Sequence, residues 1–168
     1  MRTRLGVYGC GVELRAYRDE DCRPTREVFE RAVRLTAAGD YSDEQVAAWA
    51  PTDMSASDLA AWGVERASAK TIVAAEGEEL LGFGDLVDGR VLDMLYVDPG
   101  AGRRGIATAL LDRILSLARD TGVDTIETDA SITARAFFER HGFVVVEQRS
   151  PVVRGVGMTN FKMRRPFA

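Results

Sequence analysis

Short apolar runs separated by turn residues dominate the middle of this chain. Three of them cover residues 71–76, 80–87 and 91–97, and only the short segments around Gly77 and Asp88-Gly89 separate them. Each run has the length of a strand, and the third is expected to be a buried central strand. Connections this short join antiparallel strands, because a parallel crossover needs about a dozen residues or more. The pattern therefore predicts a three-stranded antiparallel meander.

A helical spacing replaces this pattern after residue 97. Apolar residues recur every three or four positions, at Ile106, Leu110, Ile114 and Leu117. This period predicts an amphipathic helix from about residue 104 to 121. The helix supplies a connection long enough for the next strand, 124–129, to lie parallel to the central one. A ligand is expected where this parallel pair interrupts the antiparallel order, beyond the carboxyl ends of the strands.

The ends of the chain complete one sheet. A helix over 132–141 is expected to begin at Ser131, and strands 143–148 and 157–163 follow as an antiparallel pair. At the other end, residues 1–11 are expected to form a tail and residues 12–17 an edge strand. Helices between the first two strands should begin at Asp21, at Ser42 and at Ser55 or Ser57. The predicted fold class is α/β (α+β), a mixed, mostly antiparallel central sheet flanked by helices, in a single domain over 12–168.

Composition excludes several classes of protein. The chain has 168 residues, 46% of them hydrophobic, which suits one globular domain. A formal charge of −4 argues against a nucleic-acid partner. With two cysteines and one histidine, the sequence predicts neither a disulfide framework nor a metal site. No apolar run has the length of a membrane span, so we expect no membrane partner and a cytoplasmic location.

The turn after the central strand is rich in glycine and arginine. Gly100, Gly102 and Gly105 allow the backbone to approach a ligand closely, and Arg103 and Arg104 add positive charge. The following helix begins here, and its first N–H groups lack intrahelical partners. The turn therefore predicts a site for phosphate or pyrophosphate.

This turn also reads G-x-G-x-x-G, the fingerprint of dinucleotide-binding enzymes, with Asp129 near the position of a ribose-binding acid. Two features count against that interpretation. About half of the chain precedes the turn, and Asp98-Pro99 separates the strand from the first glycine.

The order of elements resembles the GCN5-related N-acetyltransferase (GNAT) family over roughly residues 12–164. The family signature Q/R-x-x-G-x-G/A aligns with residues 102–107, preceded by L-Y-V-D-P and followed by A-L-L. The segment A-R-A-F-F-E-R-H-G-F is similar to the family pattern A-x-x-x-Y-E-x-x-G-F. The resemblance implies an acetyl-CoA site in which the turn holds the pyrophosphate and the central strand pairs with the pantetheine arm. The implied cofactor residues are Leu95, Tyr96, Val97, Gly102, Arg103, Arg104, Gly105, Ile106, Ala107, Thr108, Ser131 and Phe138.

The sequence departs from the family pattern at three positions. Gly102 replaces the usual Gln or Arg, which removes a side-chain contact and leaves the backbone N–H groups. Phe138 stands where many members have a tyrosine thought to protonate the departing thiolate, and Ser131 where an asparagine is common. We therefore expect cofactor binding to survive and the usual acid to be missing.

Asp93 is the first candidate for a general base, because a carboxylate in a central strand is expensive unless it is paired or useful. The alternative is a structural ion pair with a nearby arginine. Tyr96 is the second catalytic candidate, and Glu127 and Asp129 are further ones. Candidate acceptor-binding residues are Tyr41, Trp49, Arg154 and Asn160, whereas Trp62 is expected to pack in the core.

The function predicted is transfer of the acetyl group of acetyl-CoA to a primary amine, by direct attack in a ternary complex. The acceptor is a small-molecule or protein amine that the sequence does not identify, and a homodimer is left open. A second hypothesis is a non-catalytic acyl-CoA-binding regulatory domain, which would explain the missing tyrosine. An NAD-type dinucleotide-dependent enzyme is the third.

Overall fold

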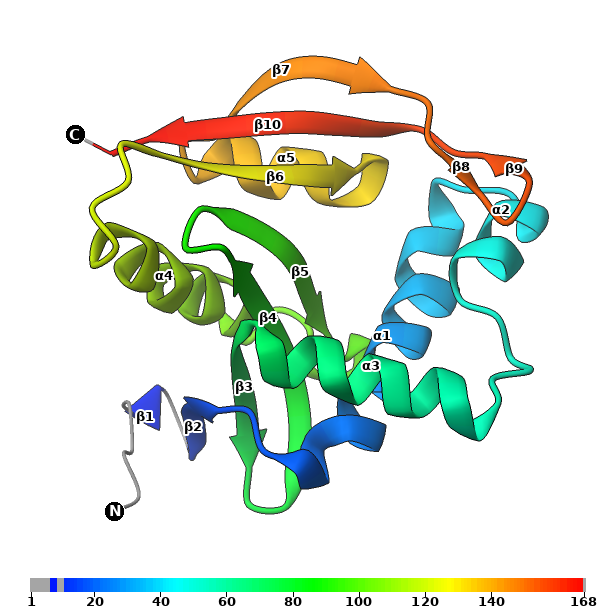
Figure 1. Ribbon diagram of the computed structural model, residues 1–168, viewed down its shortest axis with the longest axis horizontal. Coiled ribbons are helices and arrows are strands. Elements are labelled where there is room, and N and C mark those ends of the chain that lie inside the picture. Colours follow the sequence, from blue (N-terminus) through cyan, green and yellow to red (C-terminus); the bar gives the residue numbers. More distant parts are fainter. Residues whose placement is uncertain (1–6, 9–10, 168) are drawn as a thin grey trace.

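The computed structural model describes residues 7–8 and 11–167, which form one large sheet with helices on both faces (Figure 1). The sheet has eight strands in the order β1-β2-β3-β4-β5-β6-β10-β7. Its strands are β1 (Val7–Tyr8), β2 (Val12–Ala16), β3 (Lys70–Glu76), β4 (Glu79–Val87), β5 (Val91–Val97), β6 (Thr125–Ser131), β7 (Val144–Arg149) and β10 (Asn160–Pro166). The helices are α1 (Cys22–Arg31), α2 (Asp43–Trp49), α3 (Ala56–Ser68), α4 (Ile106–Arg119) and α5 (Ile132–Arg140). No helix of this described part is long and apolar enough to cross a membrane.

The predicted fold class is confirmed. Strands β3, β4 and β5 form the antiparallel meander, and β5 and β6 are the parallel pair. Strands β7 and β10 pair antiparallel, with a small hairpin of β8 (Val152–Val153) and β9 (Val156–Gly157) between them. The predicted edge strand is covered by β1, which pairs with β2. The rest of the predicted tail, residues 1–6 and 9–10, lies outside the described residues.

Helix boundaries follow local capping chemistry. Ser42 and Ser55 both accept a hydrogen bond from the backbone three residues later and begin α2 and α3 as predicted. Asp21 precedes α1 but gives it no side-chain cap. Its carboxylate instead pairs with Arg15 at 2.7 Å and accepts the N–H of Arg18. Helix α1 continues through a π-turn (Ala32–Thr36) and a 3-10 turn (Ala37–Gly39).

Alternate side chains of β3 fill two separate cores. Ile72 and Ala74 pack with Leu110 of α4 on one face, while Val73 packs with α1 and α3 on the other. This division follows from the two-residue period of a strand, whose successive side chains point to opposite faces. Both faces of the meander are therefore buried, and its strands are held rigidly.

The sheet divides where β5 meets β6. Residue pairing between these strands stops after Val91↔Glu127 and Leu92↔Thr128, and Figure 1 shows β6, β10 and β7 fanning away from β2 to β5. At the next residue of β5, the register of the β4–β5 ladder shifts, so that Asp93 has no opposite residue in β4 and forms a bulge. The bulge and the separation place the end of β5 beside open space.

Gly84 is expected to be required for the close approach of α4 to β4. A Cβ added there would lie 2.7 Å from Ile114 Cδ1 and 3.1 Å from the Met94 carbonyl oxygen. Gly84→Ala should therefore lower the free energy of unfolding by about 1–3 kcal/mol, the usual effect of overpacking. Gly39→Ala is the control, since its Cβ would meet nothing within 4 Å. Equal urea midpoints for the two variants would contradict this packing account.

Candidate functional site

Two cavities open where β5 and β6 separate. The first, which we call the β5 cavity, has a volume of about 200 Å³ and runs along Leu95, Tyr96 and Val97 to Ala107 of α4. The second, the aromatic cavity, has a volume of about 360 Å³ and lies among α1, α2, α3 and the segment after β8. Both cavities are lined by Trp49, Tyr96 and Ser131. They therefore adjoin at these three side chains.

The glycine turn ends in a left-handed residue that opens α4. Gly105 is the N-cap of α4 with φ +75°, and a Cβ there would meet nothing within 4 Å, so the space outside the turn is free. The N–H groups of the first turn of α4 lack intrahelical partners and carry the positive end of the helix dipole. The N–H of Gly102 instead donates to Pro99 O at 3.3 Å. The backbone donors that the turn can offer to an anion are therefore those of Gly105 and the start of α4.

The two arginines predicted to bind the anion, Arg103 and Arg104, lie in different surroundings. Arg104 pairs with Glu76 at 2.9 Å, and more than a third of each side chain is exposed. Arg103 adopts φ +62°, which is uncommon for a residue with a side chain. The turn thus combines free backbone donors with positive charge, and its chemistry suits a pyrophosphate.

The edge of β5 that faces β6 is unpaired beyond Leu92 among the described residues. Leu95, Tyr96 and Val97, which follow on this strand, line the β5 cavity. An extended ligand with amide groups could therefore add to this edge as a strand does. This is the part of the site that suits a pantetheine arm.

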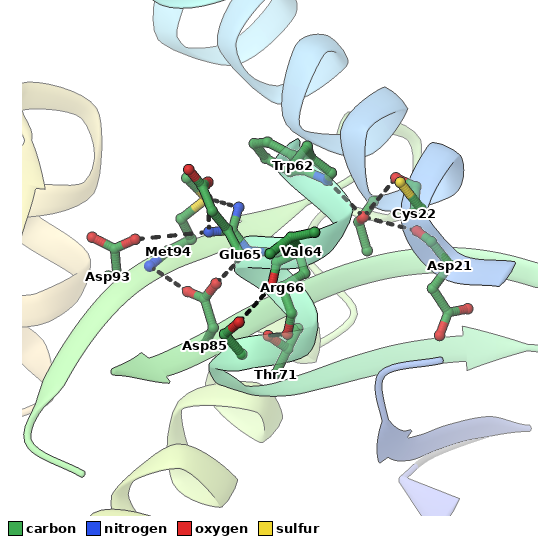
Figure 2. A network of polar contacts seen from close by, with 12 residues as sticks. Asp21, Cys22, Trp62, Val64, Glu65, Arg66, Thr71, Asp85, Asp93 and Met94 are labelled. Atoms are coloured by element: carbon green, nitrogen blue, oxygen red, sulfur yellow. Dashed lines mark hydrogen bonds and ion pairs between the residues drawn. The ribbon is translucent and has the colours of Figure 1, made fainter. Parts of the chain in front are cut away.

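A buried ion pair supports the bulge at Asp93. Figure 2 shows Arg66 of α3 reaching across to Asp85 of β4, with an Nε to Oδ2 distance of 2.7 Å and both side chains at most 3% exposed. The other oxygen of Asp85 accepts the N–H of Met94 at 2.8 Å. Arg66 also stacks on Trp62, 4.5 Å from its ring centroid. Burial raises the pKa of Asp85 to about 6, and the guanidinium of Arg66 opposes this shift.

Asp93 itself faces the aromatic cavity. Its side chain is 51% exposed and lies 4.0 Å from Arg66 Nη2, at the outer limit of an ion pair. Figure 2 shows that Arg66 is engaged more closely by Asp85, with Asp93 at the edge of this network. The Asp93 side chain is thus left beside the aromatic cavity. This position is compatible with both interpretations of Asp93, a general base that faces the cavity and a structural partner of Arg66.

The junction of the cavities has a polar side chain with a high pKa. Burial raises the pKa of Tyr96 well above its usual range, and a hydrogen bond with the Trp49 side chain opposes the rise. The indole N–H can only donate, so Tyr96 oxygen accepts this bond and keeps its own proton. At neutral pH, Tyr96 is therefore a neutral hydroxyl able to donate a hydrogen bond.

The predicted acceptor residues are divided between two places. Tyr41, Trp49 and Asn160 all line the aromatic cavity. The Tyr41 hydroxyl is engaged structurally, because it donates to Thr159 O at 2.6 Å and accepts the N–H of Ile132 at 2.9 Å. Arg154 does not line this cavity; it borders a third cavity and donates to Ala48 O at 2.7 Å.

The remaining predicted residues have clear structural surroundings. Phe138 is 3% exposed, packs on Phe143 at 5.1 Å between ring centroids and lines the β5 cavity. Ser131 caps α5 through the N–H of Ala134. Glu127 pairs with Lys162 at 3.1 Å, and Asp129 pairs with Arg149 at 3.2 Å while it lines the aromatic cavity.

Sequence reasoning missed several residues of the site. Arg26, Asp85 and Arg66 were not candidates, and Trp62, expected only in the core, also lines the aromatic cavity. One signal was available for Asp85, since it is charged within the apolar run LLGFGDLV. The sequence gives no signal for Arg26 and Arg66, because arginines on amphipathic helices usually face solvent. Only the fold shows that these two point inward.

Comparisons with known proteins agree on one family. The sequence model described as acetyltransferase (GNAT) domain matches residues 37–165. The uncharacterized N-acetyltransferase YafP of Escherichia coli (strain K12) is 38% identical over 153 residues, which are 91% of this chain and 95% of that protein. A GCN5-related N-acetyltransferase structure from Rhodopseudomonas palustris has a TM-score of 0.89 at 30% identity and covers 96% and 99% of the two chains. The PaiA N-acetyltransferase of Thermoplasma acidophilum, solved with coenzyme A, has a TM-score of 0.74 at 21% identity, covering 94% of this chain and 100% of the other.

Removal of Asp85 is expected to be strongly destabilising. Asp85→Ala leaves the guanidinium of Arg66 buried without its closest anion, which should lower the free energy of unfolding by about 3–5 kcal/mol. Glu127→Ala, which breaks the partly exposed pair with Lys162, should lower it by about 1 kcal/mol or less. Urea unfolding followed by circular dichroism measures both. Similar small losses would show that the buried pair does not hold the bulge.

Proposed function

This chain belongs to the acetyltransferase (GNAT) domain family, and we propose that it transfers the acetyl group of acetyl-CoA directly to a primary amine in a ternary complex. One observation carries the proposal. The β5 cavity and the aromatic cavity adjoin at Trp49, Tyr96 and Ser131, so two substrates can meet there without leaving the protein. Holding both partners in one place can remove about 7 kcal/mol or more of the barrier.

The donor substrate, acetyl-CoA, would supply a thioester carbonyl that an amine can attack. Gly105 and the first N–H groups of α4 would bind its pyrophosphate, with Arg103 and Arg104 adding charge. The unpaired edge of β5 at Leu95 to Val97 would hold the pantetheine amides. The Ser131 and Phe138 side chains, both in the wall of the β5 cavity, would orient the thioester end.

Asp93 would accept the proton of the attacking amine. A primary alkylammonium has a pKa of about 10, so most of it is protonated at neutral pH and a base or a water relay is needed. The bulge turns Asp93 toward the aromatic cavity, and half of its side chain is accessible there. Its position at the bulge, next to the residues that border the cofactor, favours this role over that of a structural partner.

Tyr96 would assist the departing sulfur. Phe138 carries no proton to donate, whereas the neutral hydroxyl of Tyr96 borders both cavities. Because burial raises its pKa, this hydroxyl stays protonated throughout the neutral range and acts as a hydrogen-bond donor without transferring its proton. Because a thiolate leaves more easily than an alkoxide, a hydrogen bond from this hydroxyl is sufficient assistance.

Tyr41, Trp49 and Asn160 would form the acceptor wall, and Arg154 would act from outside it by holding α2. Release of CoA thiol on incubation with acetyl-CoA and a panel of amines tests the whole proposal. Stabilisation by acetyl-CoA without any thiol release would instead favour a non-catalytic acyl-CoA-binding domain. Phe138, which replaces the usual tyrosine acid, is the observation that favours this alternative. A homodimer stays a prediction.

Gly105→Ala is expected to weaken the binding of acetyl-CoA and not that of the amine. Its Cβ would project into the free space where a pyrophosphate meets the first N–H groups of α4. The KM for acetyl-CoA should rise about tenfold or more, which corresponds to about 1.4 kcal/mol of binding. Gly122→Ala is the matched control, since Gly122 has φ +79° and equally free surroundings at the far end of α4. If backbone strain alone were responsible, the KM for acetyl-CoA would rise equally in both variants. That result would mean that the pyrophosphate does not bind at Gly105.

Asp93→Asn should lower kcat by about 10²-fold with little change in either KM, as expected for loss of a general base. The amide preserves the shape of the bulge but accepts no proton. Initial rates of thiol release measure the effect. A folded variant with unaltered kcat would assign Asp93 a structural role only.

A further inference from the structure

Two buried polar atoms in the wall of the aromatic cavity make no hydrogen bond with the rest of the described chain. They are Nη2 of Arg26, a donor, and Oδ1 of Asn160, an acceptor. A buried polar group without a partner destabilises the protein, and each such group requires an explanation. A ligand that supplies both an acceptor and a donor would satisfy the two atoms together.

Arg26 is held rigidly in this wall. It is 9% exposed, and its guanidinium lies 4.7 Å from the ring centroid of Phe29 and 5.1 Å from that of Trp62. Its Nε donates to Glu30 at 2.8 Å, which fixes one edge of the planar group. A guanidinium fixed in this way is preorganised for a planar anion, above all a carboxylate.

No other basic residue of the described chain lines the aromatic cavity. Of its two acidic residues, Asp129 pairs with Arg149 at 3.2 Å, whereas Asp93 lies 4.0 Å from Arg66, which Asp85 engages more closely. An anionic group of a ligand would therefore be drawn to Arg26. Arg26 and Trp62 line both the aromatic cavity and the third cavity, and neither lines the β5 cavity. Arg26 therefore lies at the end of the aromatic cavity that adjoins the third cavity.

Asn160 belongs to the opposite end. It is the register partner of Ser131 in the β10–β6 pair, and Ser131 lines both cavities. Its free carbonyl oxygen is thus near the junction where the thioester would lie, and it can accept an N–H of an amine. The two unsatisfied atoms define a direction, with the amine at the junction and the anion at Arg26.

We propose that the acceptor is an amino acid with an apolar side chain, whose carboxylate binds Arg26 and whose amine binds Asn160. Phe29, Trp62 and Met158 would contact the apolar side chain. This inference rests on the proposed acetyl transfer. The amine nitrogen forms a bond to the acetyl carbon as the carbon–sulfur bond breaks, the amine proton passes to Asp93, and the thiolate takes up a proton. The products are an N-acetyl amino acid and CoA.

The test compares acceptors that differ only in the carboxylate: L-phenylalanine with 2-phenylethylamine, and L-leucine with 3-methylbutylamine. In the wild-type protein, kcat/KM should be higher for the amino acid of each pair. Arg26→Met should lower kcat/KM for the amino acids on the order of 10²-fold, as loss of a charged hydrogen-bonded pair would, and change the amines little. Arg26→Lys should recover part of the loss, because it restores the charge without the planar fork.

Arg23→Met is the matched control, since Arg23 is an exposed arginine on the same helix and lines none of the three cavities. It should leave both acceptor classes unchanged. Acetyl-CoA affinity and the urea midpoint of Arg26→Met show whether the variant folds. Equal rates for amino acid and amine in the wild-type protein, or an equal loss for both in a folded Arg26→Met protein, would overturn the inference.

Binding measurements decide the case if no acceptor is turned over. Titration of L-phenylalanine into the protein saturated with CoA should release heat for the wild type and none for Arg26→Met. Absence of binding, or equal binding by the two proteins, overturns the amino acid assignment. Failure of acetyl-CoA itself to bind would overturn the proposed function, and turnover of amines alone would overturn only the acceptor class.

Discussion

The backbone hydrogen bonding between β5 and β6 ends after two residue pairs, and the rest of the site depends on this early end. A continuous ladder would close the sheet and leave no space at its centre. Because β5 is fixed by β4 on its other side and by cores on both faces, it stays in place when its partner departs. The protein thereby keeps an unpaired, half-buried strand edge beside the β5 cavity, inside a rigid framework.

The buried pair of Arg66 and Asp85 stabilises this arrangement at the bulge. A bulge leaves a backbone N–H without its ladder partner, and Asp85 accepts the N–H of Met94 in its place. Arg66 then compensates the charge and packs against Trp62. The irregular part of β5 is thus held by side chains from α3 and β4, which explains how the bulge can be both distorted and well defined.

Periodicity predicted most of the fold. The antiparallel meander, the parallel step at β6 and the capping by Ser42 and Ser55 all follow from local spacing and turn chemistry, which act over a few residues. The glycine turn was visible for the same reason. The inward-pointing arginines were not, because whether a helix shows a given face to solvent depends on segments far away in the sequence. Asp21 shows a second limit: even six residues away, Arg15 in the preceding strand pairs with the carboxylate that was expected to cap α1, and capping patterns alone do not reveal this competition.

The attachment of the β8–β9 hairpin and the residues after it to Tyr41 and Gln45, beside the aromatic cavity, has a consequence for how the protein can evolve. Gln45 donates to Gly157 O in β9, and Tyr41 donates to Thr159 O in the segment between β9 and β10, so both contacts use backbone carbonyls. Any residue type offers the same carbonyl. The side chains of this segment can therefore change while its docking persists. Under the proposed function, the acceptor preference could then change without any change in how acetyl-CoA is bound.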